Sequence, residues 1–171
     1  MGGLVGLLGG LAMNLYAGGS GLNTVVVINQ SRTNSIELGN YFCERRQVPP
    51  ENVLRINWSG ANTAWTSAEF QTVLLDPLLT MLAARQLTSQ IGYVVLAMDI
   101  PFQTVYGSTV NSTTAALFYG LKNTSGSEGA EVRNSYAGSE QDFHQARPVS
   151  APGASFLTTM LTAGSLAQAK R

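Results

Sequence analysis

Two short runs of consecutive apolar residues most constrain the fold, TVVVI at residues 24–28 and YVVLAM at residues 93–98. A half-exposed strand alternates apolar and polar residues, whereas an unbroken β-branched run is typical of a strand covered on both faces. A third run, VLRIN at residues 53–57, carries Arg55 at its centre and is expected nearer an edge. The chain is therefore predicted to build a largely buried sheet.

Helical segments follow the first and second strands. Asn34 or Ser35 is the expected N-cap of the first helix, which runs to about Arg46 and stops before two prolines. In the second helix, apolar residues recur at helical spacing over residues 70–82, and Pro77 predicts either a kink or a restart. Strands that alternate with helices and right-handed crossovers give a parallel α/β sheet.

The remaining elements complete the predicted topology. TSAE at residues 66–69 is a capping-box pattern, and SFLTTMLT at residues 155–162 is the expected fourth strand, followed by a helix start at Gly164-Ser165. The most apolar strands, the first and third, are placed side by side, which gives the order 2-1-3-4. We predict an α/β fold with a three-layer parallel sheet of flavodoxin-like or caspase-like order. It is expected to be incomplete at the C-terminus, because the six last residues cannot form a stable helix alone.

The domain organisation has two parts. Residues 1–22 form a signal-like apolar leader or an arm packed on the domain, and residues 23–171 the N-terminal part of one α/β domain. The leader hypothesis places cleavage after Ala12 or Gly19 and predicts export to the periplasm, the cell surface or the medium. A membrane helix or a start codon chosen too late are the other interpretations. A long loop insertion is predicted at residues 107–153, where Gly, Ser, Thr and Asn predominate.

Charge and cysteine content exclude several classes. Ten basic and ten acidic residues balance and do not cluster, so no nucleic-acid partner is expected. Cys43 is the only cysteine, which rules out an internal disulfide and a cysteine-based zinc site, and it is expected to be a buried structural thiol. No dinucleotide fingerprint, Walker loop, G-x-S-x-G or H-E-x-x-H pattern is found. Neither a metal nor a cofactor is predicted.

Ligands of open parallel sheets bind beyond the carboxyl ends of the strands, at the point where the strand order reverses. Here that point lies between the first and third strands. The predicted ligand-binding residues are Asn29 and Ser31 after the first strand, and Asp99 and Gln103 after the third. Asp99 could be a base, a metal ligand or an acceptor for the backbone amides of the Ile100-Pro101 turn, and Asn29 has the same ambiguity.

The predicted long loop holds further polar candidates. Ser112 and Thr113 precede a helical stretch at residues 113–121, where they could bind an anion or simply cap the helix. The only histidine, His144, is expected to be solvated rather than catalytic. No Ser, His and acid set can be assembled, so the catalytic residues are unknown.

Several motifs carry a family resemblance. They are TVVVINQ, NSIELGNYFCERRQVPPENVLRI, SAEF with DPL, and YVVLAMDIP, together with SFLTTMLTAGSLAQAK near the end. Residues 23–105 and 154–171 thereby resemble a family of uncharacterised exported bacterial proteins with an N-terminal parallel α/β domain. The resemblance implies the same fold, export and a continuation beyond Arg171. It implies no activity and no site residues.

Three functional hypotheses follow. The first is an exported or cell-envelope domain that binds a small molecule, a glycan or a peptide, with membrane contact only through an uncleaved leader. The second is a hydrolase of caspase-like or gingipain-like peptidase architecture, whose catalytic residues lie in a missing C-terminal part. The third is an unstable product of gene prediction.

Overall fold

A computed structural model describes residues 20–122 and 156–170 of the chain. The apolar leader up to residue 19, residues 123–153 of the predicted loop, and His144 lie outside these ranges. The elements, in chain order, are η1 (Gly21–Asn23), β1 (Thr24–Asn29), α1 (Thr33–Arg46), η2 (Pro50–Asn52), β2 (Val53–Ile56), β3 (Ala64–Thr66), α2 (Ser67–Glu69), η3 (Phe70–Leu75), α3 (Asp76–Ala84), β4 (Tyr93–Leu96), β5 (Gln103–Tyr106), β6 (Thr109–Ser112), α4 (Thr113–Tyr119), β7 (Leu157–Met160) and α5 (Leu166–Ala169).

The main sheet has four parallel strands in the order β2-β1-β4-β7. This confirms the predicted parallel α/β class. Val26 in the middle of β1 lies opposite Val53 of β2 and Val95 of β4. Strand β2 lies at an edge with Arg55 exposed, as its charge indicated. Strand β7 is shorter than the predicted strand at residues 155–162.

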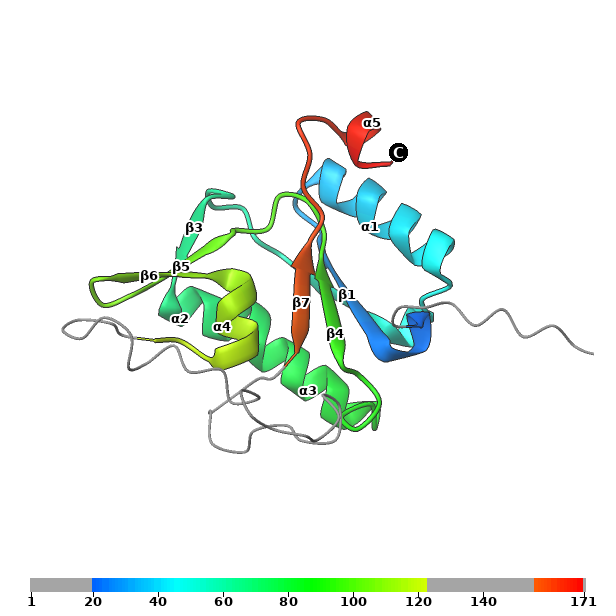
Figure 1. The fold of residues 1–171 in the computed structure, drawn as a ribbon, viewed down its shortest axis with the longest axis horizontal. Helices are drawn as coiled ribbons and strands as arrows, with labels where there is room; N and C mark the ends of the chain where they lie inside the picture. The colour runs from blue at the N-terminus through cyan, green and yellow to red at the C-terminus, as the bar shows by residue number, and fades with distance from the viewer. Residues whose placement is uncertain (1–19, 123–155, 171) are drawn as a thin grey trace, which may run out of the picture.

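Strand β1 is buried along its whole length because helices cover both faces of the sheet. Val25 and Val27 pack into a large core with the residues of η3 and α3. Val26 and Ile28 point to the other face and pack beneath α1. In Figure 1, α1 and α3 accordingly lie on opposite sides of the strands. Successive side chains of β1 point to opposite faces of the sheet and both faces are covered, so TVVVI has no polar residue in its interior.

The start of α1 differs from the prediction. The helix begins at Thr33 with Arg32 at the N-cap position, and no side chain caps it. Ser35 cannot serve as the cap because its hydroxyl accepts a hydrogen bond, at 2.9 Å, from the backbone N–H of Asn29. The side chain predicted to start the helix instead ties its first turn to the end of β1.

The second helix does not restart at Pro77. It runs continuously from the capping box of Thr66 and Glu69, which is confirmed, through η3 and α3. Segment η3 is π-helical, and the N–H of Asp76 bonds to the carbonyl of Gln71. A π-helical segment shifts the hydrogen-bond pairing by one residue, so the missing N–H of proline is absorbed without a break.

A second sheet, which the sequence analysis did not predict, occupies residues 64–66 and 103–112. Strand β3 pairs in parallel with β5, and β5 forms an antiparallel hairpin with β6. Strand β6 was not predicted within the loop insertion at residues 107–153, whereas α4 confirms the helical stretch predicted at residues 113–121. Trp65 is buried in β3, and its indole N–H donates to the Thr104 hydroxyl at 2.9 Å.

Candidate functional site

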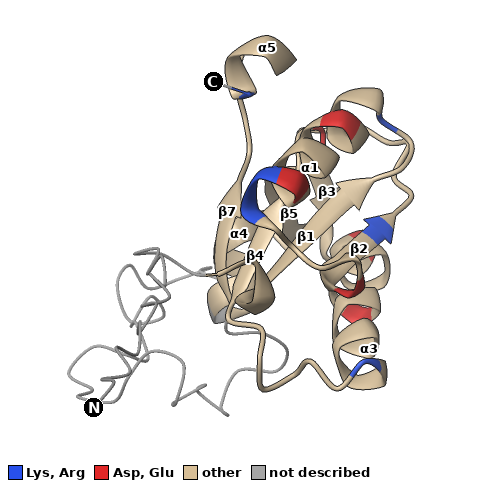
Figure 2. Cartoon of the chain, turned by 90° about the vertical axis from the view of Figure 1, so that its right-hand side faces the viewer, with Lys and Arg blue, Asp and Glu red and all other residues tan. Residues whose placement is uncertain are grey.

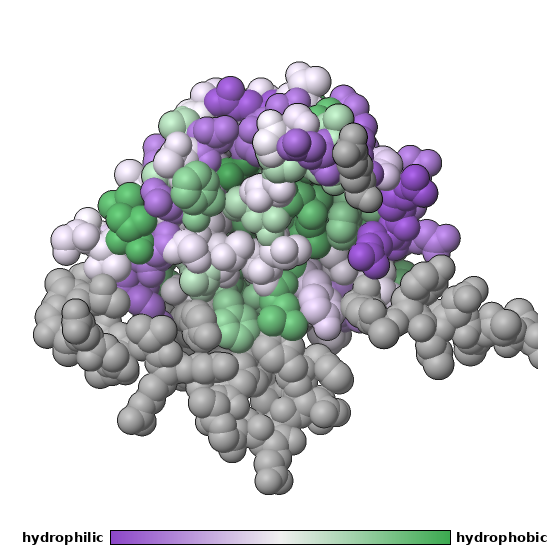
Figure 3. Space-filling view, turned by 45° about the horizontal axis from the view of Figure 1, so that its top comes forward, coloured by the Kyte–Doolittle hydropathy of each residue, from purple (hydrophilic) through white to green (hydrophobic). Residues whose placement is uncertain are grey.

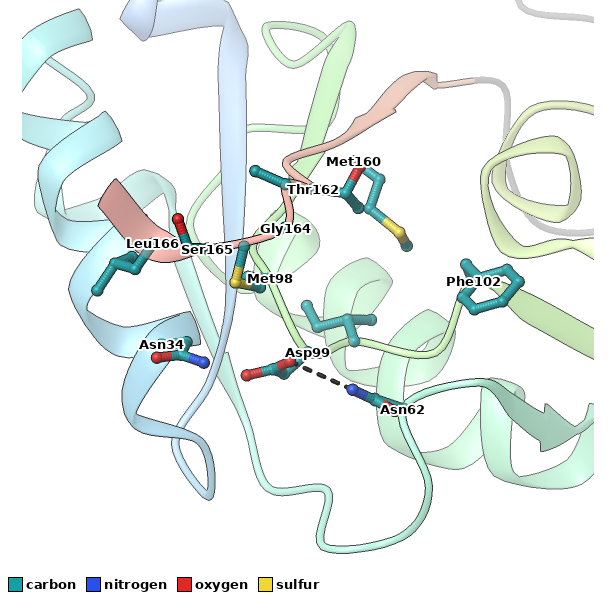
Figure 4. A pocket seen from close by; sticks show the side chains of 12 residues that line it. Asn34, Asn62, Met98, Asp99, Phe102, Met160, Thr162, Gly164, Ser165 and Leu166 are labelled. Carbon is teal, nitrogen blue, oxygen red and sulfur yellow. Dashed lines mark hydrogen bonds between the residues drawn. The ribbon is translucent and has the colours of Figure 1, made fainter. Parts of the chain in front are cut away.

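A hollow of about 320 Å³ opens at the carboxyl edge of the main sheet, where the C-terminal ends of its strands meet. The residues after β4 and β7 form most of its wall, and the first turn of α1 and the β2–β3 connection complete it (Figure 4). The lining residues are Asn34, Asn62, Met98, Asp99, Ile100, Phe102, Met160, Thr162, Ala163, Gly164, Ser165 and Leu166. This is the position at which open parallel sheets bind their ligands.

Asp99 is the central polar residue of the hollow. It stands between Asn34 and Asn62, and its carboxylate accepts a hydrogen bond from Asn62 Nδ2 at 3.3 Å (Figure 4). Its φ of 62° is left-handed, a conformation that costs on the order of 1 kcal/mol and that aspartate tolerates better than most residues. Strained backbone of this kind clusters at functional sites.

Asn29 holds the backbone around Asp99 in place. Its side chain is completely buried and makes four hydrogen bonds. Oδ1 accepts from the backbone N–H of Ser31 at 3.1 Å and of Trp58 at 3.0 Å. Nδ2 donates to the carbonyl of Trp58 at 2.9 Å and to that of Asp99 at 3.3 Å. With every donor and acceptor used, Asn29 positions the ends of three strands and does not line the hollow.

The other predicted site residues lie elsewhere. Ser31 is exposed, and its N–H is taken by Asn29. Gln103 begins β5 in the second sheet, where its N–H donates to the carbonyl of Thr63. Ser112 caps α4 by accepting from the N–H of Ala115 at 3.0 Å.

Thr113 has a structural role in the second sheet. It is completely buried and accepts from the indole N–H of Trp65 at 3.2 Å. Of the six predicted residues, the hollow brings in Asp99 alone.

Most of the lining was not predicted from the sequence. Asn62 follows the second strand of the main sheet, and Thr162 and Ser165 follow the fourth, so the carboxyl-end rule could have found these three had it been applied to those strands. Asn34 follows the first strand, where it was interpreted as a helix cap. Ser165 also caps α5, because its hydroxyl accepts from the N–H of Gln168 at 3.3 Å.

The wall formed by the β7–α5 connection is anchored on α1. The Tyr41 hydroxyl donates to the carbonyl of Lys170 at 2.9 Å, and the Lys170 ammonium pairs with Glu37 at 2.5 Å. The Lys170 ammonium also lies 5.3 Å from the centre of the Tyr41 ring. These contacts join the last described turn of the chain to the helix that forms the opposite wall.

Among the described residues of the lining, Asp99 is the sole charged one, and neither lysine nor arginine is part of it. Figure 3, which brings this edge forward, shows apolar and polar side chains intermixed across the surface. Basic and acidic residues also adjoin each other along α1 in Figure 2. Within residues 20–122 and 156–170, no group of three or more His, Cys, Asp or Glu residues could hold a metal ion.

Among the described residues, the two with shifted pKa values lie away from the hollow. Burial raises the pKa of the Cys43 thiol, although Arg55 and a backbone hydrogen bond oppose the shift. Cys43 lies on α1 and is half-buried, not fully buried as expected. Hydrogen bonds from the backbone N–H and hydroxyl of Thr66 lower the pKa of Glu69.

Comparison with known proteins adds no further assignment. No protein-family model, no curated protein and no solved structure matches the chain. In the described part of the chain, no helix is both long enough and apolar enough to span a membrane.

Proposed function

We propose that this protein is a ligand-binding α/β domain, exported or associated with the cell envelope, that holds a small molecule in the hollow. The supporting observation is the hollow itself, with Asp99 in a strained conformation at the carboxyl edge. Its volume is at the lower end of the roughly 300–1,000 Å³ of small-molecule sites. We assign the sheet to the three-layer class with flavodoxin-like or caspase-like order, because helices stand on both faces.

The hydrolase hypothesis has no observation in its favour. A peptidase of that architecture needs a nucleophile and a base within hydrogen-bond reach of each other. Among the described residues the lining holds neither cysteine nor histidine, and the Ser165 hydroxyl is used to cap α5. That hypothesis places its catalytic residues in a C-terminal part beyond Arg171, so the binding proposal rests on the hollow itself and not on this absence.

A fragment screen on the isotopically labelled full chain, read by amide chemical shifts, tests the binding function. Hits are expected to shift the amides of residues 98–102 and 162–166. Thr162→Trp places an indole at the exposed rim of the hollow and is expected to abolish these shifts. Thr88→Trp, in an exposed turn before β4, is the matched control and should keep them. Hits that map elsewhere, or none at all, would reject the proposal.

Export and family membership form a separate part of the proposal. They rest on the apolar segment before Arg32, the first charged residue, and on the resemblance of residues 23–105 and 154–171. Mass spectrometry of the protein from cells that express the full chain tests export. A mature N-terminus after Ala12 or Gly19 is expected in the exported fraction. Intact protein confined to the cytoplasm would contradict this part and leave the binding proposal standing.

A further inference from the structure

Resting on the proposed binding function, we infer that the ligand of the hollow is a neutral polyhydroxylated ring, of the size of one sugar unit. Three properties of the lining support this assignment: its charge, its pattern of hydrogen-bonding groups, and its apolar wall and volume. They argue in turn against anionic ligands, ammonium ligands and extended chains.

Charge excludes anionic ligands. Phosphates and carboxylates are recognised by arginine and lysine, and the part of the lining that the structure describes has neither. The one charged group in that part is the carboxylate of Asp99, which would repel an anion within a few ångströms. A ligand that carries a phosphate or a carboxylate into the hollow would thus lose hydration without gaining a partner.

The hydrogen-bonding groups favour hydroxyls over an ammonium. Asp99 offers acceptor sites only, whereas the amides of Asn34 and Asn62 on its two sides offer both donors and acceptors (Figure 4). A hydroxyl also donates and accepts, so neighbouring hydroxyls on a ring can satisfy the carboxylate and an amide at once. An ammonium only donates, so it can bind the carboxylate and the amide oxygens but offers no acceptor to the amide N–H groups, whereas a hydroxyl serves both.

The apolar wall suits the C–H face of a ring. Met160 and Phe102 lie on the side of Asp99 away from Asn34 (Figure 4). The Phe102 ring is 48% exposed, which leaves surface free for a ligand at the rim. A ring that turns its hydroxyls to Asp99 and its C–H groups to Met160 and Phe102 contacts both the polar and the apolar part of the lining. About 320 Å³ is enough for one such ring but not for an extended chain.

Amide-shift titrations of the full chain with three kinds of probe test the inference. The probes are methyl glycosides of glucose, galactose, mannose and N-acetylglucosamine, with cyclohexylamine as the cation and cyclohexanecarboxylate as the anion. At least one glycoside is expected to bind at least about tenfold tighter than either charged probe, the difference that one charge-assisted hydrogen bond can supply. Tighter binding of the amine or the carboxylate would overturn the inference.

Asp99→Asn gives a second readout. Asparagine tolerates a left-handed φ and has the same size, so the variant is expected to fold and to lose only the carboxylate. Its glycoside affinity should fall by on the order of tenfold or more. Asp76→Asn, in α3, is the matched control and should bind as the unmodified chain does. Unchanged affinity of Asp99→Asn would also overturn the inference.

The two proposals fail in different ways. If fragments shift the amides of the hollow but no glycoside does, the sugar inference is wrong and the binding function stands. If neither fragments nor probes act on the hollow, the binding function fails as well.

Discussion

Replacing Asn29 with alanine removes four hydrogen bonds from the place where β1, β2 and β4 end. Their lengths run from 2.9 to 3.3 Å, and the side chain that makes them is completely buried. A net contribution of about 1 kcal/mol for each bond, less for the longest, predicts a loss of about 3–4 kcal/mol in the free energy of unfolding. That is a large fraction of the roughly 5–15 kcal/mol typical of a folded domain.

The pH dependence of the stability of Asn29→Asp tests the orientation of the same side chain. The substitution turns a carboxylate oxygen, in place of the amide N–H group, toward the carbonyls of Trp58 and Asp99. The two backbone N–H bonds to the other oxygen lower the pKa of this carboxyl, but complete burial and the two facing carbonyls outweigh them and should raise its folded-state pKa above the unfolded value of about 3.9. Between the two pKa values the folded state binds one more proton, so stability falls by about 1.4 kcal/mol for each pH unit gained. The variant should be closest to the unmodified chain in acid.

Urea unfolding followed by tryptophan fluorescence measures both variants at several pH values. Asn62→Ala is the control, because its side chain is exposed and makes one bond of 3.3 Å, so a loss below about 0.5 kcal/mol is expected. A loss below about 1 kcal/mol for Asn29→Ala, or greater stability of Asn29→Asp as pH rises, would refute the reasoning.

Three further results are expected. Gly39→Ala should lower stability by roughly 1–3 kcal/mol, outweighing a helix-propensity gain of about 1 kcal/mol, because the added Cβ would lie 2.5 Å from Ile28 Cγ1 and 2.7 Å from Ile28 Cδ1. Adding Ile28→Val, which removes Cδ1, should recover part of the loss, and a Gly39→Ala variant of unchanged stability would contradict this. Because the pKa of Glu69 is lowered in the folded protein, Glu69 should stabilise the protein relative to Glu69→Ala at neutral pH, and this stabilisation should vanish as pH falls through the lowered pKa. Thermal melts of both proteins at several pH values measure the difference, and equal melting temperatures at neutral pH would contradict the expectation. Because burial raises the pKa of the Cys43 thiol, iodoacetamide should alkylate it more slowly in the native protein than in urea. Arg55 opposes this rise, so Arg55→Gln should slow the native reaction further, and faster alkylation of that variant would disprove the role of Arg55.

The main sheet was predictable because its signals are local. The β-branched run at residues 24–28 indicated a strand covered on both faces, and both core clusters confirm it. Arg55 in the second strand indicated an edge position, and Thr66 with Glu69 indicated a capping box. In each case the physical reason for the structure lies in a few residues that are neighbours in the sequence.

The second sheet was not predictable in the same way. Its strands hold three or four residues each, and Trp65 finds its hydroxyl partner Thr104 at a separation of 39 positions. A short polar strand gains stability from its cross-strand partners rather than from its own composition. Without those partners, residues 103–112 have the composition of a loop.

Local patterns in the chain decide which segments become the strands of the main sheet and the helices beside them, and they identified Asp99 as a residue at the end of a strand. The tertiary structure alone decides that Asp99 faces Asn34, Asn62 and the β7–α5 connection across one hollow. It also decides that Asn29 is buried and holds the ends of the strands together by hydrogen bonds, and is not a ligand-binding residue. The physical reason is that the parallel pairing of β1, β4 and β7 sets which strand ends become neighbours, and that pairing depends on contacts between segments far apart in the chain.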